Sequence, residues 1–149
     1  MDPREAILAR LLIVAAAVDT SLSIRRNEAD VSGSNLPAVI LFDGEEVARD
    51  TDTQGRPADA PRNVDMTPEV QFRLEAKAPE VGTNLNLLRA KLIDAVLSDS
   101  ALLALTVNNR SIRYQGSMTA TERGRSMEGG IGVAFTFTYI LKPGQLAST

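Results

Sequence analysis

The stretch that decides the fold is IGVAFTFTYIL, residues 131–141. Its odd-numbered positions carry large apolar side chains, whereas the even-numbered positions from 132 to 138 carry Gly, Ala, Thr and Thr. Because successive side chains of a strand point to opposite faces of its sheet, this alternation predicts one buried face and one face of small side chains. A small face lets a neighbouring subunit approach closely, so we expect Ala134, Thr136 and Thr138 at an interface. A Thr136→Lys variant should then fold normally but assemble badly.

A second alternating strand is predicted over residues 64–76. Apolar side chains share one parity there, and charged or polar side chains occupy the other. Pro68 interrupts the first part of this run, which predicts an edge position or a bulge because proline cannot donate to the sheet ladder. Shorter extended segments are expected at residues 22–25, 38–42 and 112–118.

Two helices are predicted from apolar residues that recur at three- and four-residue spacing. The first begins with Asp2 as N-cap, Pro3 at the first helical position and Glu5 three residues after the cap, which is the pattern of a capping box. The second covers residues 85–97.

A short helical turn is expected after the second helix, with Ser98 or Ser100 as its cap. The order of elements is then helix, three strands, helix, two strands. In 149 residues with 44% hydrophobic and 23% charged side chains, this order predicts a single α+β domain over 1–149. We expect a mostly antiparallel sheet with two helices packed on one face.

Two polar segments separate the predicted elements. The Asp43-Gly44 pair predicts a turn that ends the strand at 38–42. Residues 45–61 then lack apolar periodicity and are too many for an ordinary connection, so we expect a long mobile loop at about 45–63. The second segment, residues 119–130, is polar and Gly-rich and is expected to be a hairpin loop.

The chain contains no Cys and no His. These absences remove disulfides, thiolate nucleophiles, Cys-ligated zinc and the commonest general base. A Ser or Thr nucleophile would need a Lys or a carboxylate as its base, and no such spacing stands out. We therefore expect a protein that binds other proteins and is not an enzyme, with no catalytic or cofactor-binding residues. A small hydrolase that uses carboxylates or Lys is the alternative from another class.

Two short motifs have residue types that can occur in ligand sites. The sequence Asp43-Gly44-Glu45-Glu46 offers oxygen ligands to a divalent metal, but its spacing matches no calcium loop, and a solvated acidic turn is favoured. The glycines at 129, 130 and 132 precede no helix, so they lack the context of a phosphate-binding loop. Neither motif predicts a metal or a cofactor.

The formal net charge of −3 supplies no positive field for binding DNA. With two Tyr, four Phe and no Trp, the chain also lacks aromatic residues for stacking bases. Paired arginines could contact phosphate, but acidic residues lie close to both pairs, which favours salt bridges within or between proteins. The charged residues expected at a subunit or partner interface are Arg25, Arg26, Glu45, Glu46, Arg49, Arg56, Arg123 and Arg125.

The apolar stretch 11–18 follows Arg4 and Arg10 and has some features of a signal peptide. Asp2 and Glu5 interrupt the basic start, and the stretch fits an amphipathic helix better. It is also too short to span a bilayer, so we expect no membrane association.

Taken in order, these features resemble the tail terminator family of long-tailed bacteriophages and related phage-like particles. The resemblance covers most of the chain, and the order carries it, since none of the features is an active-site signature. They are the N-terminal helix, Ile24-Arg25-Arg26-Asn27, Pro37-Ala38-Val39-Ile40-Leu41-Phe42-Asp43-Gly44-Glu45, Met66-Thr67-Pro68, the helix at 85–97 and Phe135-Thr136-Phe137-Thr138-Tyr139.

In that family the subunit is a two-helix α+β domain that forms a hexameric ring, stops polymerisation of the tail tube and presents a surface to the neck. The resemblance implies a homo-hexamer that contacts the tail tube protein and a neck or head-closure protein. It would sit at the head-proximal end of the virion tail, after synthesis in the bacterial host cytoplasm. DNA would slide through the ring without specific binding. A tube subunit or a head-closure protein is the nearer alternative.

Overall fold

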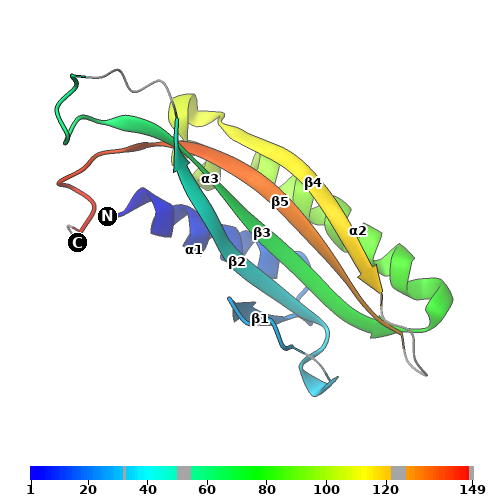
Figure 1. The fold of residues 1–149 in the computed structure, drawn as a ribbon. Coiled ribbons are helices and arrows are strands. Elements are labelled where there is room, and N and C mark those ends of the chain that lie inside the picture. The colour runs from blue at the N-terminus through cyan, green and yellow to red at the C-terminus, as the bar shows by residue number, and fades with distance from the viewer. Residues whose placement is uncertain (32, 50–54, 122–126, 148–149) are drawn as a thin grey trace.

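The fold is built on one five-stranded sheet with strand order β1-β2-β3-β5-β4 (Figure 1). The computed structural model describes residues 1–31, 33–49, 55–121 and 127–147. The short β1 pairs with β2 in parallel, and every other pair is antiparallel. The strands are β1 (Ser23–Arg26), β2 (Ala38–Ala48), β3 (Arg62–Ala76), β4 (Ile112–Thr121) and β5 (Met127–Leu141).

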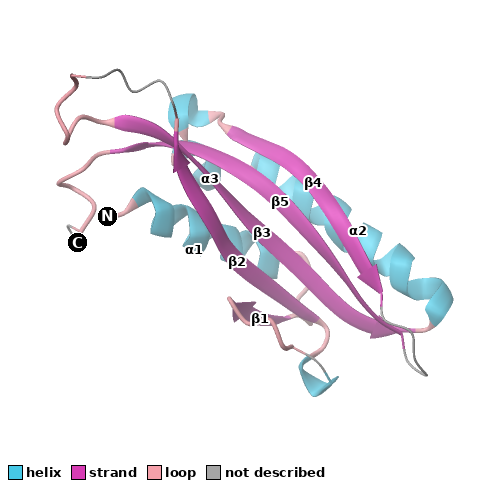
Figure 2. Cartoon of the chain, in the orientation of Figure 1, coloured by secondary structure: helices cyan, strands magenta, loops and turns pink. Residues whose placement is uncertain are grey.

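The two long helices pack on the same face of this sheet (Figure 2). The first lies against β1, β2 and β3, and the second lies against β3, β5 and β4. The predicted α+β class, with a mostly antiparallel sheet and two substantial helices, is therefore confirmed. The helical segments are α1 (Pro3–Ala16), α2 (Ala78–Ser98), α3 (Ser100–Ala104), η1 (Gly33–Asn35) and η2 (Val107–Asn109).

The main core lies between the helices and the sheet. The helices contribute Leu8 and Leu11 of α1 and Leu92 of α2. These side chains pack against the apolar face of the central strands, where Phe72 and Phe135 are fully buried. Burial of each such side chain contributes about 1.5–3 kcal/mol. The alternation that predicted β3 and β5 thus marks the face that the helices cover.

A second, smaller apolar cluster lies on the other face of the sheet, over β2. Val31, from the connection between β1 and β2, packs there against Ala38 and Ile40. This cover explains why residues 38–42 are continuously apolar, since a strand buried on both faces has no row of solvent-exposed side chains.

Strand β2 continues past the predicted Asp43-Gly44 turn. The register with β3 shifts between Phe42 and Glu45, and Gly44 has a φ of 72°, so the pair forms a β-bulge inside one strand. The Asp-Gly pair correctly indicated a positive φ. That conformation occurs both in β-bulges and in hairpin turns, so it did not distinguish between them. Pro68 lies opposite this bulge in a central strand, so the predicted edge position is wrong, and the bulge belongs to β2 rather than to the strand that contains Pro68.

Strand pairing also shortens both predicted loops. Residues 45–48 belong to β2 and residues 62–63 to β3, so the connection is shorter than the predicted 45–63 segment, of which residues 50–54 lie outside the described part of the chain. In the predicted 119–130 loop, β4 extends to Thr121 and β5 starts at Met127. These strand ends are polar, so their sequence carries no apolar alternation.

The helix boundaries differ from the predicted ones in instructive ways. At the start of α1, Asp2 Oδ1 accepts from the Arg4 backbone N–H at 2.9 Å, whereas Glu5 turns away to Arg26 and does not close the capping box. Helix α2 begins at Ala78 rather than near residue 85. Only Val81 is buried in its first two turns, so the sequence there lacks the apolar spacing that predicts a helix. In the described ranges, no helix is long and apolar enough to cross a membrane.

Candidate functional site

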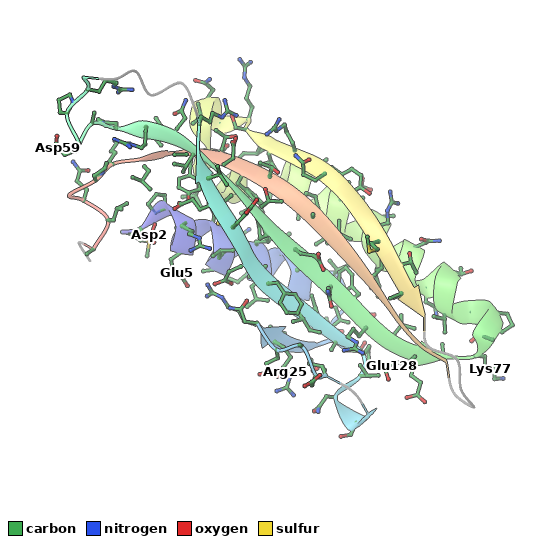
Figure 3. All side chains as sticks on the ribbon, viewed as in Figure 1. Asp2, Glu5, Arg25, Asp59, Lys77 and Glu128 are labelled. Atoms are coloured by element: carbon green, nitrogen blue, oxygen red, sulfur yellow. The ribbon has the colours of Figure 1, made fainter. Side chains whose placement is uncertain are left out.

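The sheet face opposite α1 and α2 is called here the open face. No helix of the described residues covers it over β3, β5 and β4 (Figure 3). Its side chains are the polar row of β3 and the row of small residues of β5. Strand pairing places on this face Asp65, Thr67, Glu69, Gln71, Arg73 and Glu75 of β3, the even-numbered residues 128–138 of β5, and Arg113, Met118 and Ala120 of β4.

One end of the open face holds a network of three side chains. Arg49 Nε lies 3.1 Å from Asp65 Oδ2, and its Nη2 lies 3.2 Å from both Asp65 Oδ1 and Thr138 Oγ1. The Thr138 hydroxyl donates to Asp65 Oδ1 at 2.5 Å. Burial alone raises the pKa of Asp65, but the hydrogen bonds from Arg49 and Thr138 outweigh burial, and the pKa is lowered overall. Asp65 therefore stays ionised within this network.

The two threonines predicted at an interface are used within the subunit. Thr136 is 5% exposed and shares a hydrogen bond of 3.0 Å with the hydroxyl of Thr67 on β3. Thr138 is 4% exposed and belongs to the Arg49 network. A lysine at position 136 would break the Thr67 contact. The expectation that Thr136→Lys folds normally assumed an exposed side chain, whereas Thr136 is buried.

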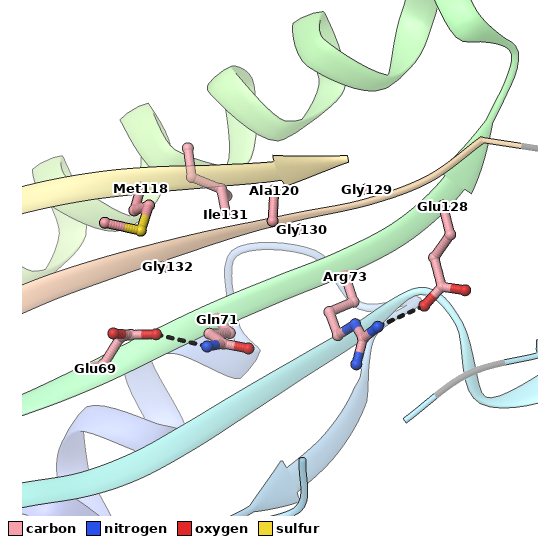
Figure 4. Close-up of a pocket in the computed structure, with 10 residues that line it drawn as sticks. All are labelled: Glu69, Gln71, Arg73, Met118, Ala120, Glu128, Gly129, Gly130, Ile131 and Gly132. Atoms are coloured by element: carbon pink, nitrogen blue, oxygen red, sulfur yellow. Dashed lines mark hydrogen bonds and ion pairs between the residues drawn. The ribbon is translucent and has the colours of Figure 1, made fainter. Parts of the chain in front are cut away.

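Toward the other end, the open face is hollowed into a trough (Figure 4). Its floor is β5, where Gly130, Gly132 and Ala134 present at most a methyl group. One wall is formed by Glu69 and its neighbours on β3, and the other by Met118 and Ala120 on β4. Two adjoining hollows of about 260 and 280 Å³ make up the trough and share Glu69, Met118 and Gly132.

The polar groups in the trough differ in how they are neutralised. Arg73 Nη2 lies 2.7 Å from Glu128 Oε1, and its Nη1 donates to the carbonyl oxygen of Ala29 at 3.0 Å. Glu69 Oε1 instead accepts from the neutral amide of Gln71 at 2.6 Å. Across the described residues, no ion pair includes Glu69, so none of their cations balances its charge.

A second charged cluster joins α1, β1 and β2. The Arg26 guanidinium donates to Glu5 on α1 and to Asp43 in the β2 bulge, with N–O distances of 2.8–3.0 Å. These hydrogen bonds from Arg26 lower the pKa of both carboxyls and raise the pKa of the guanidinium. Arg25 faces Asn35 Oδ1 at 3.1 Å instead.

The remaining predicted residues do not join one site. Glu45 is exposed on β2, and Glu46 accepts a hydrogen bond from the hydroxyl of the buried Tyr139. Arg56 donates to the carbonyl oxygen of Pro61 at 2.9 Å, within its own connection. Arg123 and Arg125 lie outside the described residues. Of the predicted interface set, the structure therefore gathers Arg49, Ala134, Thr136 and Thr138 on the open face.

Asp43 and Glu46 bond to different partners and Glu45 is exposed, so the three carboxylates do not share a common centre. Asp43 is held by Arg26 and Glu46 by Tyr139. In the portion of the chain that the structure covers, no three Asp or Glu side chains gather closely enough to hold a metal ion.

Sequence reasoning missed the two side chains that define the trough. Glu69 is one of the polar side chains that alternate along β3, and nothing in the local sequence distinguishes it from Glu75 on the same face of the strand. Met118 is 80% exposed on β4, although a methionine in an extended segment is usually counted as core. The pairing of β5 with both β3 and β4 brings them together, and the β3–β5 pairing joins segments that lie far apart in the sequence.

Comparison with known proteins adds no assignment. No protein-family model matches this sequence, and the curated proteins searched contain no similar chain.

Proposed function

We propose that this chain is a structural subunit of a long-tailed phage or a related phage-like particle, and that it assembles into a ring that caps the tail tube. One surface of the ring would stop tube polymerisation, and the opposite surface would face the head or neck. The observation that carries the proposal is the open face, a sheet surface that no helix of the described residues covers and whose trough presents Gly130, Gly132, Ala134, Met118 and the Glu69 carboxylate. It stands beside the order of sequence features that resembles tail terminators.

The polar chemistry of the open face supports a structural role. Its threonines, Arg49, Arg73 and most of its carboxylates are already bonded to each other, as in the Arg49–Asp65–Thr138 network. The chain also has no His or Cys to serve as base or nucleophile. Complementary surfaces are all that a capping subunit needs.

Particles assembled without this chain provide the test. If the subunit ends tail growth, electron micrographs should show tails that over-extend and fail to join heads, and adding the purified protein should restore a uniform length. Tails of normal length that still join heads would rule the function out. Absence of any tube would instead indicate a tube subunit, and finished tails of normal length without heads would indicate a head-closure protein.

A further inference from the structure

We propose that the trough on the open face binds an extended, basic segment of a partner protein, with the Glu69 carboxylate accepting from an Arg or Lys side chain of that segment. This inference does not depend on a ring, because it concerns a surface that each subunit carries alone. It rests on the shape, charge and apolar exposure of the trough.

The width of the trough selects an extended chain. Strands β3 and β4 flank β5, so their backbones are about 10 Å apart. An α-helix with its side chains is about 10–12 Å across and would ride on the walls without reaching the floor. A single extended strand is narrower, and the floor at Gly130 and Ala134 carries no side chain larger than a methyl group, while the Glu69 carboxylate covers Gly132 between them.

The charge in the trough selects a cation. The Glu69 carboxylate lies over the backbone of Gly132, so closely that a Cβ at that position would come within 2.5 Å of Oε1. Gln71 supplies one neutral donor, and among the described residues no cation pairs with the Glu69 carboxylate. Charge-assisted hydrogen bonds are about twice as strong as neutral ones, so an Arg or Lys is the matching group.

The opposite wall selects the rest of the segment. Met118 is 80% exposed, and its flexible thioether side chain suits contact with irregular apolar surfaces. The alkyl stem of an Arg or Lys that reaches Glu69 would cover Met118 on the way. Every second residue of the partner segment would face the floor. A second copy of this chain, with a net charge of −3, is the poorer match to an acidic trough.

The test uses the purified full-length chain and a synthetic peptide of about ten residues that alternates arginine with threonine, long enough to fill the trough. A matched peptide with glutamate in place of arginine is the control ligand. Calorimetric titration should show binding of the arginine peptide alone. Glu69→Gln should weaken binding about tenfold or more, since it removes a charge-assisted hydrogen bond. Glu75→Gln removes the same charge from an exposed position on the same strand and should leave the dissociation constant unchanged.

Met118→Ser should also weaken binding without lowering the melting temperature, because this side chain is already exposed. Equal affinity for the two peptides, or equal effects of Glu69→Gln and Glu75→Gln, would overturn the proposal. So would self-association that Met118→Ser abolishes in a protein that binds neither peptide, because the occupant would then be a second copy. The titration needs no tails, so its failure leaves the tail-length experiment to stand or fall separately.

Discussion

Arg26 at the end of β1 holds Asp43 in the β2 bulge through two parallel hydrogen bonds, from Nε to Oδ1 at 2.9 Å and from Nη2 to Oδ2 at 3.0 Å. The same guanidinium makes a second pair of hydrogen bonds to Glu5 on α1. One side chain therefore joins the first helix, the edge strand and the bulge, and it neutralises two carboxylates that would otherwise repel each other.

Replacing Arg26 with Gln should lower the unfolding free energy at neutral pH by about 1–2 kcal/mol, since the cluster is only partly buried. Arg26 lowers the pKa of both Glu5 and Asp43 in the folded protein. This stabilisation is therefore complete above the unfolded-state pKa values, near 4, and is lost as the pH falls through the lower folded-state values. Urea unfolding of both proteins should show a stability gap that narrows below about pH 4. A gap that stays constant into strong acid would contradict this account.

The two faces of β5 should respond differently to substitution. Phe135→Ala empties a fully buried aromatic site and should cost about 3–5 kcal/mol of unfolding free energy. Ala134→Lys adds a long side chain to the floor of the trough, where the stem can reach water, so the melting temperature should change little. Particle mass by light scattering should show whether Ala134→Lys also blocks assembly. A stable Phe135→Ala protein beside an unfolded Ala134→Lys protein would mean that the faces are reversed.

Gly44→Ala should destabilise the protein by about 2–3 kcal/mol, because residue 44 has a φ of 72° and an added Cβ would collide with the carbonyl oxygen of Thr67. Gly82→Ala is the matched control. It lies in α2 with nothing within 4 Å of the added Cβ, and it should stabilise by about 0.5–1 kcal/mol. Thermal unfolding of the two variants should therefore shift in opposite directions, and a shared direction would refute the bulge interpretation.

Asp99 performs two tasks that substitutions can separate. Its Oδ2 accepts from the Leu102 backbone N–H at 2.9 Å as the N-cap of α3, and both carboxylate oxygens bind Arg10 at 2.7–2.9 Å. Asp99→Ala should cost about 1–2 kcal/mol by removing both. Asp99→Asn keeps the cap acceptor and should cost less. Equal losses in chemical denaturation would show that the cap contributes nothing measurable.

The fold class follows from patterns that are local in sequence. Alternation along residues 131–141 identified the buried parity of β5, and the three- and four-residue spacing of apolar side chains identified α1 and most of α2. These patterns are visible in the sequence because every second residue of a strand, and every third to fourth residue of a helix, faces the same core. In the first two turns of α2 most side chains are exposed, so the apolar spacing is absent and the predicted start of the helix is too late in the sequence.

The sequence by itself determined the class, the buried faces and the lack of His and Cys chemistry, since all three depend on which residues occur and at what spacing. Only the tertiary structure decided that Gly44 makes a bulge, that Val31 covers β2, and that Thr136 is buried. It also decided that Glu69 and Met118 face each other across Gly132. Each of these depends on which distant strand lies alongside, and strand pairing is settled by the packing of the whole sheet rather than by any one segment.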